Sequence, residues 1–148
     1  MSGFHFPYLE QFLLALVLTG ATVFIHGLGM QGVRRYLSRS QALAEAQRRS
    51  KSHLLTMVGI IWIMLVTHSL EVVIWALFYR LRGVIPQWVS AVYFSLASYT
   101  TLGESSVTLP AHWQGLGGFE AMVAMLMFGW SIAMLATVLL KLRIVDTN

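Results

Sequence analysis

The sequence has no cysteine and little charge. Without cysteine the chain forms neither disulfides nor thiolate metal sites. Charged residues make up 11% of its 148 residues, whereas a soluble globular domain carries roughly 25%. Hydrophobic residues make up 57%, and the mean hydropathy is +0.69. A chain this short cannot hide so much apolar surface in a water-soluble core. The composition therefore excludes an ordinary soluble domain and predicts an integral membrane protein.

Three uncharged stretches are long enough to cross a bilayer, which takes about 20 apolar residues. They are residues 11–33, 52–70 and 121–140. A fourth uncharged stretch, residues 83–103, contains Pro86 and five Ser or Thr residues. Its strongly apolar part is nearer to about 12 residues, which favours a segment that enters the membrane and returns on the same side.

The basic residues predict the orientation of the spans. Six of the ten lie between the first two spans, which the positive-inside rule places in the cytoplasm. These six are Arg34, Arg35, Arg39, Arg48, Arg49 and Lys51. If residues 83–103 return, Lys141 and Arg143 are also cytoplasmic, and only Arg80 and Arg82 lie outside. If residues 83–103 crossed the membrane completely, six basic residues would be cytoplasmic and four would lie outside. We therefore expect a multi-pass protein of the cell's inner (plasma) membrane, with the N-terminus outside and the C-terminus cytoplasmic.

The basic segment between the first two spans, residues 32–52, contains good helix formers and a weak apolar stripe at Val33, Tyr36, Leu37 and Leu43. One interpretation is an amphipathic helix along the inner membrane surface, with its arginines toward anionic lipid headgroups. The other is a solvated linker whose charges only set the topology. Because the basic residues lie between apolar runs, they do not indicate binding of nucleic acid.

The stretch from Pro86 to Pro110 has the clearest chemical use. Proline suits the first turn of a helix, and about four turns then reach Thr100. A short helix of this kind points the negative end of its dipole into the membrane. Non-helical backbone at membrane depth must be buried in protein or line a water-filled path. Carbonyl oxygens after the helix can then replace the hydration shell of a cation.

Residues 93–110, followed by a single apolar span, resemble the pore region of two-transmembrane potassium channels. In that family a short pore helix ends in Thr and is followed by the filter T-x-G-Y-G-D. Here Thr101-Leu102-Gly103 matches T-x-G, and Thr100 precedes it. The resemblance implies a pore domain at 53–142 with an outer helix at 53–80, a pore helix at 86–100, a filter at 100–106 and an inner helix at 117–142. Because one loop cannot enclose a filter, it also implies a homotetramer. The N-terminal transmembrane helix, 1–31, and the basic segment are additions to this pattern.

The filter departs from the family after Gly103. Glu104-Ser105-Ser106 stands where the family has Tyr-Gly-Asp, so the outer filter would be a ring of Glu104 carboxylates. Acidic rings mark sodium- and calcium-selective pores and occur in non-selective relatives. We therefore expect a cation-permeable pore with weak selectivity between K⁺ and Na⁺, and divalent binding or block by Ca²⁺ at Glu104. The alternative is that Glu104 is a surface loop residue.

His68 and Glu71 lie three residues apart on one face of the second span. Ionisable residues inside a membrane are expensive and face protein or a polar path. We expect both to support the filter from behind, by hydrogen bonds to Ser95, Ser98, Tyr99 or the backbone. Proton sensing and metal binding are the alternatives.

Three further residues carry weaker expectations. His26 is expected at the membrane interface, near the inner end of the first span. Glu120, at the outer start of the third span, would either add negative potential at a pore mouth or lie at a solvated helix end. Gly129 resembles the hinge glycine of the family's inner helices, and plain helix packing explains it equally well.

The sequence therefore predicts an all-α membrane protein with three transmembrane helices plus a re-entrant pore helix and filter loop per chain, in a tetramer. We expect passive conduction of cations, without catalysis and without a cofactor. Two alternatives remain open. One is a non-conducting structural or accessory protein related to channels. The other is a metal or proton-linked membrane protein using His68 and Glu71, with His26 and Glu120. The second is disfavoured because we expect these residues at different depths.

Overall fold

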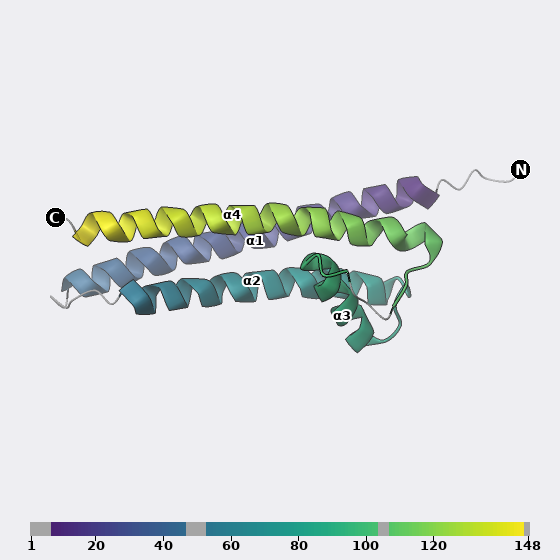
Figure 1. The fold of residues 1–148 in the computed structure, drawn as a ribbon, viewed down its shortest axis with the longest axis horizontal. Coiled ribbons are helices and arrows are strands. Elements are labelled where there is room, and N and C mark those ends of the chain that lie inside the picture. The colour runs from purple at the N-terminus through teal and green to yellow at the C-terminus, as the bar shows by residue number, and fades with distance from the viewer. Residues whose placement is uncertain (1–6, 47–52, 104–106, 147–148) are drawn as a thin grey trace, which may run out of the picture.

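The computed structural model describes residues 7–46, 53–103 and 107–146. Within these ranges the secondary structure is helical, with no β-strand. The elements are α1 (Pro7–Ala46), α2 (His53–Leu81), α3 (Trp88–Tyr99), the 3-10 helix η1 (Ala111–Trp113) and α4 (Gln114–Asp146). The long helices α1, α2 and α4 lie side by side, and the short α3 lies beside α2 near one end of the bundle (Figure 1).

The three long helices can each cross a membrane. Their apolar spans are Leu9–Leu43, His53–Leu81 and Ala111–Leu142. Even the shortest long helix, α2 with 29 residues, is about 44 Å long, which exceeds the roughly 30 Å of hydrocarbon in a bilayer. Large apolar side chains such as Leu65 and Leu126 are exposed on these helices. The chain is therefore an all-α, multi-pass membrane protein, which confirms this part of the predicted fold class, while the re-entrant loop and the tetramer stay predictions.

The helix α1 is longer than the sequence predicted. The apolar stripe of residues 32–52 was expected on the membrane surface, but α1 continues without a break to Ala46. Val33 and Leu37 are buried in a cluster with Ile60 of α2 and Val138 of α4. The interpretation as a separate surface helix is wrong, because α1 is continuous and other helices cover Val33 and Leu37, although Tyr36 and Leu43 are exposed.

The helices that follow keep the predicted order with shifted ends. The expected outer helix at 53–80 corresponds to α2, and the expected inner helix at 117–142 lies within the longer α4. The expected pore helix at 86–100 corresponds to α3, which is shorter at both ends. Pro86 precedes α3 instead of lying in its first turn, because Gln87 has an extended backbone and forms the N-cap.

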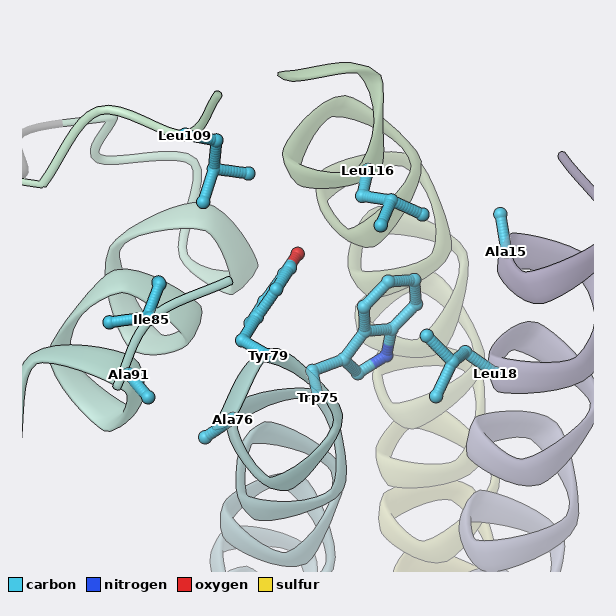
Figure 2. Packing of buried hydrophobic residues seen from close by; sticks show 9 residues of the cluster. All are labelled: Ala15, Leu18, Trp75, Ala76, Tyr79, Ile85, Ala91, Leu109 and Leu116. Atoms are coloured by element: carbon cyan, nitrogen blue, oxygen red, sulfur yellow. The ribbon is translucent and has the colours of Figure 1, made fainter. Parts of the chain in front are cut away.

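One cluster of buried apolar residues includes both ends of residues 85–109, which we call the α3 segment. Figure 2 shows Trp75 of α2 pointing toward Leu18 of α1 and Leu116 of α4. The neighbouring Tyr79 belongs to the same cluster. The full cluster is Ala15, Leu18, Trp75, Ala76, Tyr79, Ile85, Ala91, Leu109 and Leu116. Ile85 precedes α3 and Leu109 follows it, so the chain enters and leaves this segment at the same end of the bundle.

Candidate functional site

The chain turns sharply where α3 ends. Thr101 and Gly103 have φ angles of 58° and 68°, in the left-handed region. A non-glycine residue adopts this conformation at a cost on the order of 1 kcal/mol. The amide of Thr101 donates to the carbonyl of Ser98 at 3.0 Å, and that of Gly103 to the carbonyl of Ala97 at 3.1 Å. The turn thus satisfies carbonyl groups at the end of α3 with its own backbone.

Of the residues that the resemblance assigned to the filter, 100–106, the structure describes four, and these four are exposed in the single chain. They are Thr100, Thr101, Leu102 and Gly103. The Leu102 side chain is 63% exposed. These four residues are therefore accessible for contact with another molecule. Glu104 lies outside the described residues, so its part in a filter stays a prediction.

The turn lies well inside the length of the bundle. Tyr99, the last residue of α3, is buried with Val72 of α2, whereas Ile85 and Leu109 pack in the cluster of Tyr79. Val72 precedes Tyr79 by seven residues, which is about 10 Å along a helix. The segment between Ile85 and Leu109 therefore runs down the bundle by roughly that distance and comes back.

Behind the turn, side chains from all four α-helices form a hydrogen-bonded group, which we call the four-helix cluster. Glu71 of α2 is fully buried and accepts a hydrogen bond from the hydroxyl of Tyr99. Nδ1 of His26, on α1, lies 3.0 Å from Oε1 of Glu71. His68 of α2 places Nδ1 2.9 Å from the Tyr99 hydroxyl and Nε2 3.1 Å from Oγ of Ser131 on α4. The end of α3 is therefore joined to each of the other three α-helices.

This geometry agrees with one expectation and corrects another. His68 and Glu71 contact Tyr99, as the sequence predicted. Ser98 instead lies beside Gly117 of α4. The expectation that His26 lies at the membrane interface is wrong, because its side chain is fully buried against Glu71.

A second buried carboxylate holds the middle of α3. Glu120 of α4 is fully buried and accepts hydrogen bonds from the hydroxyls of Tyr79, at 2.8 Å, and Ser95. We expected it at a pore mouth or a solvated helix end. The expectation of a solvated helix end is wrong, because the two hydroxyls replace water as partners of Glu120, whereas a contribution to the potential at a pore mouth stays a prediction.

Two further expectations concern the depth of the ionisable residues and the hinge at Gly129. His26, His68 and Glu71 offer ligand atoms within 4.8 Å of one another, so the expectation that they lie at different depths is wrong for these three. Gly129 lies inside the unbroken α4, and a side chain there would meet no atom within 4 Å. Its role as a hinge stays a prediction.

Comparison with known protein families matches the part of the chain that contains α3 and the turn. A family model described as an ion channel matches residues 63–141, which cover most of α2, all of α3 and most of α4. No curated protein and no solved structure matches the chain. The matched residues lie within the pore domain that the resemblance implied. The chain therefore belongs to this family of ion channels, with a two-transmembrane, potassium-channel-like domain.

Proposed function

We propose that the protein conducts cations through a pore formed by four copies of the chain around a shared axis. The observation that carries this proposal is the α3 segment, which runs down the bundle, ends in an exposed turn at Thr100–Gly103 and returns to the same end. One chain supplies one such turn, so a closed ring needs several copies. Passive conduction requires no catalytic group and no cofactor.

The electrostatics of the segment favour cations. The C-terminus of α3 carries the negative end of its helix dipole toward the turn. The hydroxyls of Thr100 and Thr101 and the carbonyls of the turn add oxygen ligands of the kind that coordinate alkali cations. Glu71 places a buried carboxylate behind the end of α3. Four copies would sum these contributions at the axis.

Glu104 follows Gly103 directly in the sequence. In a tetramer, four Glu104 carboxylates would stand at the outer entrance of the pore. We propose that they bind Ca²⁺ from outside and block the pore, since Ca²⁺ favours several carboxylate oxygens. K⁺ and Na⁺ would pass with weak discrimination, because only the inner part of the family's filter pattern is present.

The described basic residues favour one orientation in the plasma membrane. Arg34, Arg35, Arg39 and Lys141 lie toward the end of the bundle opposite to α3, whereas Arg80 and Arg82 lie at the end where α3 packs (Figure 1). The positive-inside rule then puts the turn on the outer side and both Arg39 and Lys141 in the cytoplasm. The arginines of α1 would contact anionic lipid headgroups there.

Flux from liposomes that contain only this protein tests the proposal. We expect K⁺ and Na⁺ to leave and Cl⁻ to be retained. Gly103→Ala should lower the flux, because alanine is strained at this φ angle. Gly83→Ala is the matched control, since Gly83 has nearly the same φ, 67°, and equally open surroundings but lies outside the turn. An equal effect of both variants, or no flux from a folded wild type, would favour a non-conducting accessory protein.

A further inference from the structure

The four-helix cluster contains the ligand set of a transition-metal site. Nδ1 of His26 lies 3.0 Å from one oxygen of Glu71, and Nδ1 of His68 lies 3.2 Å from the other. Ligands around a tetrahedral Zn²⁺ at about 2.0–2.2 Å are roughly 3.4 Å apart. The ligand atoms of the three side chains all lie within 4.8 Å of one another, so one ion could contact all three after small side-chain adjustments, and two His with one Glu is a known zinc ligand set.

A candidate for the fourth ligand, an oxygen, lies beside these three side chains. The hydroxyl of Tyr99 lies 2.9 Å from Nδ1 of His68 and hydrogen-bonds to Glu71. It can complete a tetrahedral shell or yield that position to water.

Ser131 on α4 can hold the His68 ring in the orientation that a metal ligand needs. Nε2 of His68 lies 3.1 Å from the hydroxyl of Ser131. A hydroxyl both donates and accepts, so Ser131 can serve either tautomer of the ring. When Ser131 accepts from Nε2–H, the lone pair of Nδ1 points toward Glu71 and is free for a metal ion. Ordering of a ligating histidine through its second nitrogen is the usual arrangement in metal sites.

The charge of Glu71 favours a bound cation. Its carboxylate is fully buried, and its ion-pair partners among the described residues are the two histidines. A buried charge is costly unless it is compensated. A divalent ion bound between these side chains would compensate the carboxylate.

A cavity of about 380 Å³ is lined by His68, Tyr99 and Thr100 together with apolar side chains that include Leu65 and Phe128. The His68 side chain is 16% exposed. The His68 side of the cluster therefore borders an open cavity beside the turn at Thr100.

We propose that His26, His68 and Glu71 bind a divalent first-row transition-metal ion, with Zn²⁺ the best fit to this ligand set. His26 comes from α1, which lies outside the residues matched by the ion channel model, whereas His68 and Glu71 lie inside them. The ion thus fastens the additional helix to the channel domain and, through Tyr99, to the end of α3. This proposal does not rest on conduction.

Binding of Co²⁺ to the purified full chain in detergent micelles tests the site. The protein carries no polyhistidine tag and is first stripped with chelator. We expect one Co²⁺ per chain with the visible absorption of a tetrahedral nitrogen and oxygen shell, and displacement by Zn²⁺. His26→Gln keeps a donor toward Glu71 but removes a ligand, so it should weaken binding more than about tenfold. His112→Gln, at an exposed histidine of η1, should bind as the wild type does.

Two results would overturn the site. One is a folded wild type that binds no Co²⁺, and the other is equal binding by the wild type and His26→Gln. Size-exclusion chromatography checks that each variant is folded. A protein that binds Co²⁺ but shows no cation flux in the liposome assay would support the metal site and contradict the proposed conduction.

Discussion

The hydroxyl of Tyr99, the last residue of α3, donates a hydrogen bond to the buried carboxylate of Glu71 on α2. The same carboxylate contacts His26 of α1. The turn that carries the proposed filter residues begins at the next residue, Thr100. The position of the turn therefore depends on a polar contact within the membrane-spanning bundle. A substitution at Glu71 or Tyr99 should displace the turn.

Tyr99→Phe should destabilise the protein and lower cation flux. Phenylalanine fills the same space but leaves Glu71 and His68 without the hydroxyl, and loss of a buried hydrogen bond costs about 1–3 kcal/mol. Tyr93→Phe is the matched control, because Tyr93 lies on the same helix and is 46% exposed. Unfolding of both variants in detergent micelles and flux from liposomes measure the effect. Equal free energies of unfolding for the two variants would contradict the role given to Tyr99.

Ser95→Ala should release the middle of α3 from α4. Glu120 then keeps Tyr79 but loses one of its two hydroxyl donors, which should lower the free energy of unfolding by about 1–3 kcal/mol. Ser90→Ala, at a half-buried serine of α3, serves as control and should change it by less than about 0.5 kcal/mol. In a double-mutant cycle, Ser95→Ala and Glu120→Gln should show a coupling energy above roughly 0.5 kcal/mol. Additive effects would show that the two side chains do not interact.

Glu104→Gln tests the proposed outer ring. The change removes four carboxylates from the entrance of a tetramer while nearly preserving side-chain size. External Ca²⁺ should then inhibit K⁺ flux at least about tenfold less effectively, because neutral amides are poorer ligands for Ca²⁺. Glu10→Gln is the control, since Glu10 is exposed and pairs with Arg82. Unchanged inhibition in Glu104→Gln would place this carboxylate away from the permeation path.

The sequence predicted local relationships well. His68 and Glu71 are three residues apart, and this spacing on a helix determines that they share a face. The match of Thr101-Leu102-Gly103 to a filter pattern pointed to a channel, which the family comparison confirms. The left-handed φ of Thr101 was not predicted, because a β-branched residue such as threonine rarely adopts this conformation and gives no signal for it in a sequence.

Relationships between distant helices could not be predicted. His26 meets Glu71 across 45 residues, and its depth was misjudged because the end of α1 was set near residue 31. Since α1 runs from Pro7 to Ala46, His26 lies at its middle. Glu120 finds Tyr79 across 41 residues. One signal was available, because an ionisable residue in an uncharged run needs a buried partner, but the pairing itself depends on how the helices pack.

Gly29→Ala should separate α1 from α2. A Cβ at Gly29 would overlap the side chain of Thr67, and such overpacking costs about 1–3 kcal/mol. Gly20→Ala is the matched control on the same helix, because its Cβ would meet no atom within 4 Å. Unfolding in micelles should show a loss for Gly29→Ala and none for Gly20→Ala. If His26 also binds the proposed metal ion, Co²⁺ binding should weaken in Gly29→Ala alone.

Single cysteines can locate the two ends of the α3 segment, because the chain has no native cysteine. Gln87, just before α3, and His112, in η1 after the returning segment, are exposed and lie at the same end of the bundle. Gln87→Cys and His112→Cys should therefore both react in intact cells with a thiol reagent that does not cross membranes. Ser38→Cys, in the basic half of α1, should react only after the cells are opened, since the positive-inside rule places it in the cytoplasm. Reaction of Gln87→Cys and His112→Cys from opposite sides would mean that this segment crosses the membrane completely. A complete crossing would leave no returning turn and would remove the basis for a pore at Thr100–Gly103.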